Sequence, residues 1–582
     1  MQTIDKIEFR KAIHLPKTNN NEDTHIVSEL ITYTNGEQER KLRFIQNYKR
    51  PFFITKKIYR KRHTQKIEYE DIEKVERVEC TESDAVNKIS AKLGIRGRPN
   101  MRKLKMSPYL YWGDMRASTI IKKIYNSKLK GDFTPFNVCM LDIEADILTS
   151  EISLITVSMG TNSRTFISET WMRELIEGSP LDREKFTLDV YKAYEKDAPD
   201  VVSVIDGLVT LEDGSTYTLE LEYCRHEGDV ITNTMAYVHS IKPDILTAWG
   251  ALYDIETMST RAANVWGLDP KNLFSDPSVP EALRRFNIRK DDNDYKKMNS
   301  GKESFIPFQA RFHIFESTSF FIIIDYMSAF YYIRNGSEPK VPGGYGIDNI
   351  LNNYMKFKKL KPSISGMENL EKSIWHKRMS TSYKPEYTAY NIFDSKSMIL
   401  LDNKTKDLSI NMPLLLQDSE FDIFKSGPKK LLDSYTFFLL DNNKVVSTKS
   451  PLMEKFEGLG TEDWIVTLDS WKKGFDNTFS SFKGMDYIIS NLRLLTTDLD
   501  IISSYPFQTL MFGLGTSRTA RQLLDVEGFE KAYFVKENLG VCTGKVQALT
   551  FCSRMLNLPT VFEVDEFIKK RPDLIKLKKV NL

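Results

Sequence analysis

FNVCMLDIEAD, residues 136–146, is the stretch that decides the fold around which this chain is organised. Its apolar run, residues 138–141, is typical of a buried β-strand and leads directly into Asp142, Ile143 and Glu144. Side chains two apart in a strand share a face, so Asp142 and Glu144 point together while Ile143 returns to the core. Neighbouring carboxylates repel each other unless a cation or a shared proton relieves them. We therefore expect a Mg²⁺-dependent phosphodiester chemistry here, the alternative being a strand that ends in a solvated acidic turn.

Length and composition bound the other possibilities. A chain of 582 residues, 41% of them hydrophobic, is long enough for three or more domains with sizeable cores. The 82 lysines and arginines nearly balance the 79 acids, so any nucleic-acid site must be local. The five cysteines form no CxxC pair and have no histidine partner at zinc spacing, which favours a reducing compartment without structural zinc. No apolar run approaches the roughly 20 residues of a membrane span, so we expect a soluble, intracellular protein.

The pattern of strands and helices predicts an α/β (α+β) chain with three domains. Residues 1–135 carry short alternating segments broken by polar turns, which predict a strand-rich domain. Residues 136–402 alternate strand and helix patterns and include an Asp-Gly hairpin at 208–221. From 403 to 582 a new strand and helix pattern begins.

A basic segment precedes the first acidic strand. RGRPNMRKLK, residues 96–105, is followed by Tyr109, Tyr111 and Trp112. Basic residues beside aromatic residues suit a surface that tracks the backbone and stacks the bases of a single strand. A solvated basic loop that leads into a packed aromatic cluster explains the same pattern.

Three further candidates follow the first two acids along the chain. PDILTAWGALYD, residues 243–254, predicts a strand and then a helix with Asp254 near its start. A strongly helical segment from about 387 to 401 places Tyr390 and Asp394 four residues apart, hence on one face. The seven histidines are scattered, and no Ser/His/Asp or Cys/His arrangement competes for a catalytic role.

Together these segments resemble the three exonuclease motifs of the DEDD superfamily, in the version carried by family B DNA polymerases. The matching pieces are DIE (142–144), PDILTAWGALYD (243–254) and YNIFD (390–394). The resemblance implies an RNase H-like mixed-sheet domain for residues 136–402. It further implies that Asp142, Glu144, Asp254 and Asp394 hold two Mg²⁺ or Mn²⁺ ions, while Tyr390 orients the attacking water. One departure is Gly250, which stands where these enzymes usually have Asn and puts the level of activity in doubt.

DIISSYP, residues 500–506, resembles motif A of the family B polymerase palm, with Ser504 in place of the usual Leu. The resemblance implies that Asp500 ligates the metals of nucleotide transfer. It also implies that Ser503 belongs to the deoxynucleotide site, and that Tyr505 packs against the incoming sugar. The alternative is an ordinary buried strand that leads into a helix.

Residues 507–582 contain neither the fingers motif nor the second palm aspartate of that family. We therefore expect a proofreading 3′–5′ exonuclease on the front part of a viral, phage-type replicative polymerase, whose remaining palm, fingers and thumb come from a second chain. The expected partners are primer-template DNA with a single-stranded 3′ end, and deoxynucleotides in the complex, with no membrane. The expected location is the host cytoplasm or a viral replication compartment, without secretion. The rival hypotheses are a stand-alone 3′–5′ repair exonuclease and a degenerate, DNA-binding replisome scaffold.

Overall fold

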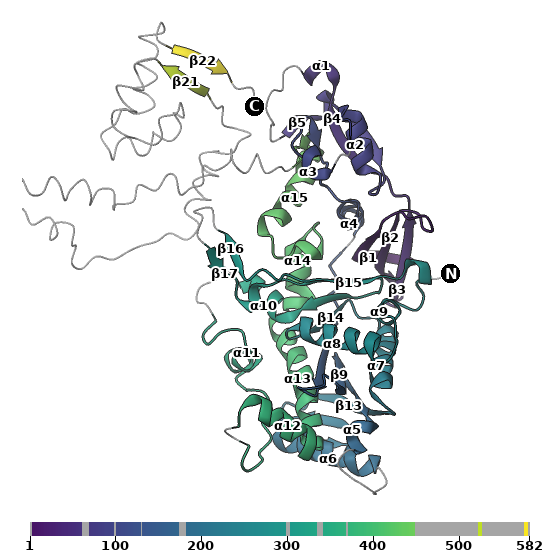
Figure 1. Ribbon diagram of the computed structural model, residues 1–582, viewed down its shortest axis with the longest axis vertical. Coiled ribbons are helices and arrows are strands. Elements are labelled where there is room, and N and C mark those ends of the chain that lie inside the picture. Colours follow the sequence, from purple (N-terminus) through teal and green to yellow (C-terminus); the bar gives the residue numbers. More distant parts are fainter. Residues whose placement is uncertain are drawn as a thin grey trace, which may run out of the picture. The chain divides into compact units, whose positions relative to one another are not determined.

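The computed structural model describes most of the first three-quarters of the chain. Its described residues are 3–60, 69–97, 100–129, 131–173, 182–297, 303–334, 341–367, 370–448, 522–526 and 575–579. They belong to two compact units, residues 1–64 with 68–448 and residues 65–67 with 449–582 (Figure 1). In the second unit an antiparallel pair is described, β21 (Gln522–Val526) with β22 (Ile575–Lys579). The predicted motif A residues Asp500, Ser503 and Tyr505 lie outside the described residues.

The first unit begins with two antiparallel sheets, which confirms the strand-rich N-terminal region. The first sheet has the order β1 (Ile4–Leu15), β2 (Thr24–Tyr33) and β3 (Gln38–Gln46). The second sheet places β4 (Arg50–Thr55) between β6 (Val75–Cys80) and β7 (Leu110–Tyr111). The helices of this region are α1 (Lys57–Arg60), α2 (Ala85–Leu93), α3 (Met101–Leu104) and α4 (Ala117–Lys128).

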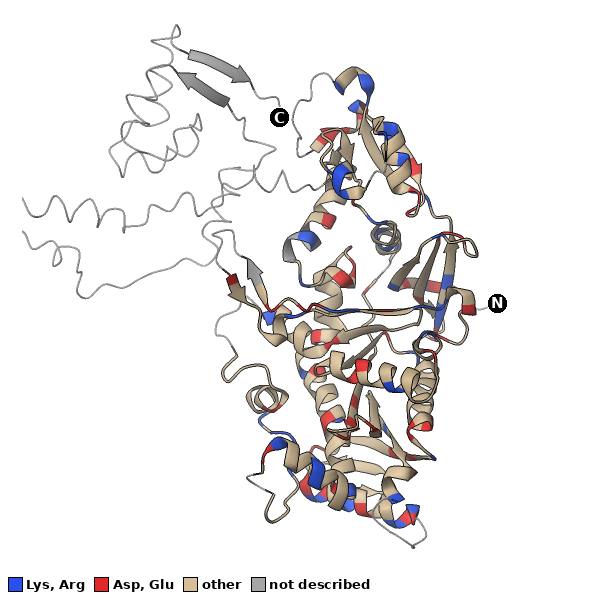
Figure 2. Ribbon diagram, viewed as in Figure 1, with Lys and Arg blue, Asp and Glu red and all other residues tan. Residues whose placement is uncertain are grey.

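Two of the three aromatic residues that follow the basic segment are withdrawn from solvent. Tyr111 is fully buried, and Trp112 is nearly so and packs edge-to-face with Phe53 and Phe437, whereas Tyr109 is partly buried. The rings of Tyr111 and Trp112 are therefore not available to stack on a base. Figure 2 shows that basic and acidic residues are interspersed along the described ribbon.

An eight-stranded mixed sheet forms the centre of the first unit. Its order is β11 (Val201–Ile205), β12 (Leu208–Leu211), β13 (Thr216–Cys224), β10 (Asn162–Ser168), β9 (Ile152–Met159), β8 (Val138–Ala145), β14 (Ile245–Ala248) and β19 (Ile322–Asp325). Strand β9 runs antiparallel to β8 and β10, whereas β14 runs parallel to β8 and β19. The predicted hairpin at 208–221 is confirmed by the antiparallel pairing of β12 with β13. The mixed α/β class is thus confirmed.

Helices pack on both faces of this sheet (Figure 1). They include α6 (Arg183–Asp197), α7 (Glu227–Ile241), α8 (Ala251–Asn264), α10 (Tyr326–Arg334), α11 (Ile347–Tyr354), α12 (Lys372–Ser382) and α13 (Lys384–Thr405). Side chains of strand β8 alternate between the two faces of the sheet. Cys139, Leu141 and Ile143 join the core under α7 and α8. Val138 and Met140 join the core under α10 and α13. By alternation, Asp142 and Glu144 lie on the face that α13 covers.

The remaining described elements are shorter or flank the sheet. They are β5 (Tyr69–Asp71), α5 (Glu169–Arg173), α9 (Pro270–Phe274), β15 (Phe286–Arg289), β16 (Tyr295–Lys297), β17 (Glu303–Phe305), β18 (Ile314–Ser317), α14 (Met412–Leu416), α15 (Gly427–Asp441) and β20 (Lys444–Val446). No helix of the described residues is long and apolar enough to cross a membrane.

Candidate active site

The five predicted residues of the exonuclease motifs come from three elements that meet at the centre of the sheet. Strand β8 carries Asp142 and Glu144, helix α8 carries Asp254, and helix α13 carries Tyr390 and Asp394. Asp142 is partly buried and the other four are buried. Asp142 experiences the charge of each of the other three acids, and Glu144 acts on both Asp254 and Asp394.

Local sequence explains how Asp254 reaches this position. Strand β14 ends at Ala248, and Gly250 begins helix α8 in the left-handed region with φ of 87°. Glycine adopts this conformation without a steric penalty, and Asn is among the few other residues that tolerate it. The sharp turn places Asp254 in the first turn of α8.

Neighbouring polar side chains hold the first two carboxylates. Asn391 Nδ2 donates to Asp142 Oδ2 at 2.6 Å. The Tyr387 hydroxyl donates to Glu144 Oε2, and His376 Nδ1 lies 2.9 Å from that same hydroxyl. Helix α13 therefore contributes both the motif residues and the groups that orient the acids on the facing strand.

Burial and mutual repulsion perturb the acids. Desolvation raises the pKa of Asp142 well above its usual range, and Asp394, Glu144 and Asp254 raise it further. Desolvation also raises the pKa of Asp254, with Asp325 and Glu144 adding to the shift. A group of acids with raised pKa values is stabilised by any cation that replaces the lost water.

Lys359 is the functional residue that sequence reasoning missed. Its Nζ donates to the Tyr390 hydroxyl at 2.8 Å and forms an ion pair with Asp394. Burial lowers the pKa of Lys359, but Asp394 and then Asp142 outweigh it, so the net shift is upward. The ammonium therefore stays charged and partly compensates the acids.

Asp325 supports the site from the end of β19. Its Oδ1 accepts hydrogen bonds from Gly250 N at 3.3 Å and Ser328 N at 3.2 Å. Burial nevertheless raises its pKa to about 6, because these N–H donors offset only part of the desolvation. Asp325 thus fixes the turn that precedes Asp254 and adds negative charge beside it.

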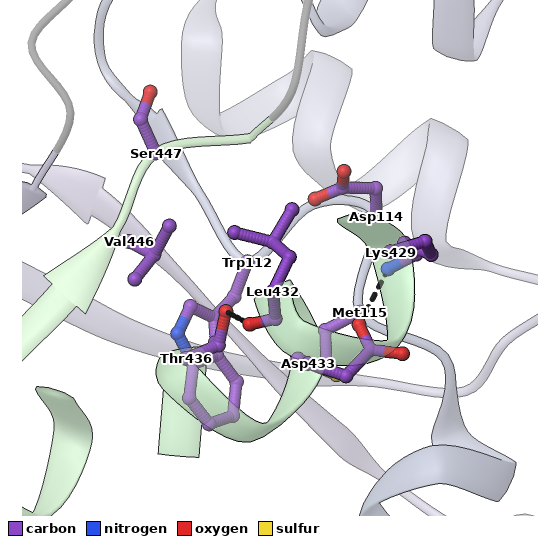
Figure 3. A pocket seen from close by; sticks show the side chains of 9 residues that line it. All are labelled: Trp112, Asp114, Met115, Lys429, Leu432, Asp433, Thr436, Val446 and Ser447. Atoms are coloured by element: carbon purple, nitrogen blue, oxygen red, sulfur yellow. Dashed lines mark hydrogen bonds and ion pairs between the residues drawn. The ribbon is translucent and has the colours of Figure 1, made fainter. Parts of the chain in front are cut away.

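Two of the four acids, Asp142 and Asp394, line a cavity of about 300 Å³. Lys359, Trp249, Gly250 and Phe308 also line it. This volume lies at the lower end of the range for small-molecule sites and is sufficient for a nucleotide unit. A separate, water-sized pocket of about 10 Å³ lies between α15 and residues 112–115 and contains none of the residues of the exonuclease motifs (Figure 3).

The donor set suits a hard divalent ion. Carboxylate oxygens are the ligands that Mg²⁺ and Mn²⁺ prefer, and buried Asp394 Oδ1 has no hydrogen-bond partner. The carboxylates nevertheless lie too far apart to share one ion as they stand. Among the described residues, no three of these acids bring ligand atoms within 4.8 Å of one another. Bound metal therefore needs small side-chain rotations, which the ion pair of Lys359 with Asp394 opposes.

Comparison with known proteins does not assign the chain to a family. No known protein-family profile matches the chain, and no curated protein matches it.

Proposed function

We propose that this chain is a metal-dependent 3′–5′ exodeoxyribonuclease that proofreads for a family B DNA polymerase. The observation that carries the proposal is the convergence of Asp142, Glu144, Asp254 and Asp394, from segments up to 252 residues apart (394 − 142), in one buried cluster, of which Asp142 and Asp394 line the cavity. Acidic residues that only keep a protein soluble lie on the surface. Buried acids that raise one another's pKa values are instead typical of functional sites.

The topology supports an RNase H-like assignment for this domain. In the five strands β10, β9, β8, β14 and β19, only β9 runs antiparallel to the others. The acidic strand β8 is therefore central, with neighbours on both sides. A central strand is a rigid support for a catalytic carboxylate pair.

The roles of the residues follow from their positions. When bound, Mg²⁺ or Mn²⁺ would lower the pKa of an attacking water and would stabilise charge on the leaving 3′ oxygen. Asp142, Glu144, Asp254 and Asp394 would hold the ions, with Asn391 and Tyr387 fixing the orientation of the first two. Burial and the nearby carboxylates raise the pKa of Tyr390, so it stays a neutral hydroxyl that can orient water.

Lys359 would have two tasks in this reaction. It holds the Tyr390 hydroxyl in place, and it offsets the charge of Asp394 when the metal is not bound. Near a DNA end its ammonium would also attract a phosphate. These tasks make it a positioning residue for the proposed hydrolysis.

The polymerase part of the proposal rests on the resemblance of residues 500–506 to motif A. Synthesis would need the fingers and second palm motifs, which residues 507–582 do not contain, with Asp500 as a metal ligand, Ser503 in the deoxynucleotide site and Tyr505 beside the sugar. In an assembly that includes those motifs, Asp500→Ala should abolish synthesis and leave exonuclease activity intact. Synthesis that survives this change would contradict the motif A assignment.

The experiment that tests the exonuclease directly asks which end is attacked. With Mg²⁺, a strand labelled at its 3′ terminus should release its label at once as a mononucleotide, whereas a 5′-labelled strand should shorten progressively. Strands with a blocked 3′ end should resist. Release from the 5′ end, or internal cleavage, would contradict the proposal.

A further inference from the structure

A second group of metal-ligating side chains lies at one end of the first N-terminal sheet. His14 and His25 are directly opposite each other in the register of β1 and β2, and their rings stack with centroids 4.7 Å apart. Asp23 immediately precedes β2. One ligand atom from each of the three residues lies within 4.8 Å of the other two, and no other group of this kind occurs among the described residues.

Several polar atoms of His25 and Asp23 have no hydrogen-bond partner within the protein. His25 is 0% exposed, and neither of its ring nitrogens has a hydrogen-bond partner. Asp23 is also 0% exposed; its Oδ1, 4.0 Å from His25 Nδ1, has no hydrogen-bond partner either. An unsatisfied buried polar group costs about 1–3 kcal/mol, so two such groups that face each other need a reason.

The remaining atoms of the group are held firmly. Asp23 Oδ2 accepts a hydrogen bond from Ser83 N at 2.8 Å and lies 3.2 Å from His14 Nε2. The carbonyl oxygen of Asp23 accepts from Asn47 N at 2.7 Å. Ser83 thus fixes the carboxylate and Asn47 fixes the backbone of Asp23, as expected for a preorganised ligand.

We propose that His14, Asp23 and His25 bind a divalent transition metal of the Zn²⁺ class. Two imidazoles and one carboxylate are a set that Zn²⁺ accepts, whereas Mg²⁺ prefers oxygen ligands alone. Three protein ligands leave a coordination position for water, on the side where the His14 side chain is 24% exposed. The cysteine spacings could not reveal this site, because strand pairing creates it.

The site has a structural consequence that is separate from the acid cluster. Through Asp23 the metal would tie the end of the first sheet to Asn47, which precedes β4, and to Ser83, which precedes α2. These contacts join the two N-terminal sheets. Bound metal should therefore stabilise this region against unfolding.

The test is equilibrium dialysis of the full chain against Zn²⁺ in millimolar Mg²⁺, which competes with Zn²⁺ for the carboxylate site. We expect one Zn²⁺ per chain, and a visible spectrum of tetrahedral type when Co²⁺ replaces it. His14→Gln should weaken Zn²⁺ binding at least about 100-fold, since loss of even an outer-shell partner costs about 10–100-fold. His226→Asn, at the partly buried N-cap of α7, is the matched control and should bind normally.

The outcomes are distinct. No Zn²⁺ binding by the unaltered chain would overturn the proposal, as would binding that survives both His14→Gln and Asp23→Asn. Because Asp23 is buried, circular dichroism should accompany each variant. Should Asp23→Asn fail to fold, the partly exposed His14→Gln and the Co²⁺ spectrum of the unaltered chain decide the question. Loss with His226→Asn as well would show non-specific binding and also overturn it.

Discussion

The ammonium of Lys359 lies 2.8 Å from the hydroxyl of Tyr390, and the same ammonium pairs with Asp394 one turn further along helix α13. A single cation thus links two residues of one motif to a segment 35 residues before Asp394 (394 − 359). It occupies the position of a counter-charge beside the acids of the cluster.

Replacing Lys359 with Met should destabilise the metal-free chain by about 3 kcal/mol, because breaking a buried ion pair leaves the partner carboxylate uncompensated. This figure is the low end of the usual range, since the Lys359 side chain is 23% exposed. Mg²⁺ should restore more stability to the variant than to the unaltered chain. Urea unfolding in EDTA and in Mg²⁺ measures both effects, and an equal response to Mg²⁺ would contradict the compensating role.

Replacing Tyr390 with Phe should lower exonuclease kcat by about 10–100-fold while changing the free energy of unfolding by only about 1 kcal/mol. The hydroxyl is lost, but the ring still packs beside Trp375 and Tyr387. Single-turnover kinetics with saturating DNA isolate the chemical step. Unchanged kcat would show that the hydroxyl does not orient the attacking water.

Much of this arrangement could be predicted from local patterns. The apolar run before Asp142 predicted strand β8, and the period of two placed Asp142 and Glu144 on one face. Lys359 could not be predicted, because it lies in the lysine-rich run KFKKLK (356–361), where nothing local distinguishes one lysine from the next. Tyr111 shows the same limit, since its burial depends on strands distant in sequence.

The pH dependence of stability should reveal Asp325. Its pKa is about 6 in the folded chain against 3.8 as the ordinary value, so the folded state binds this proton more tightly than the unfolded state. Protonated Asp325 therefore contributes about 3 kcal/mol to the free energy of unfolding below about pH 4. This contribution is lost as the pH rises through about 6. Asp325→Asn keeps an acceptor for Gly250 N and should remove this loss.

Urea unfolding of both proteins in EDTA, at several pH values between 4 and 7, checks this prediction. The free energy of unfolding should fall more steeply with pH in the unaltered chain than in Asp325→Asn. Parallel curves would show that Asp325 does not carry the raised pKa.

Replacing Gly250 with Asn should strengthen contact with DNA. Gly250 lines the cavity, and a Cβ built on it meets no atom within 4 Å. Asn tolerates the left-handed backbone and adds an amide that can form one hydrogen bond with DNA. The KM for single-stranded DNA should therefore fall by a few fold, which corresponds to the free energy of about one hydrogen bond. Gly250→Ala is the control without an amide, and identical KM values for the two variants would contradict the prediction.

The most direct test of the central claim is degradation of a 5′-labelled single strand in Mg²⁺ by the unaltered chain, by Asp142→Ala with Glu144→Ala, and by Asp146→Asn. Asp146 is the matched control, because it lies just beyond β8 and its side chain accepts from Leu148 N and Thr149 N, a role that Asn keeps. The account predicts shortening from the 3′ end that EDTA stops, that Asp146→Asn preserves, and that the double substitution slows by about 10³-fold, equivalent to about 4 kcal/mol of lost metal stabilisation. Undiminished degradation by the folded double variant would contradict it.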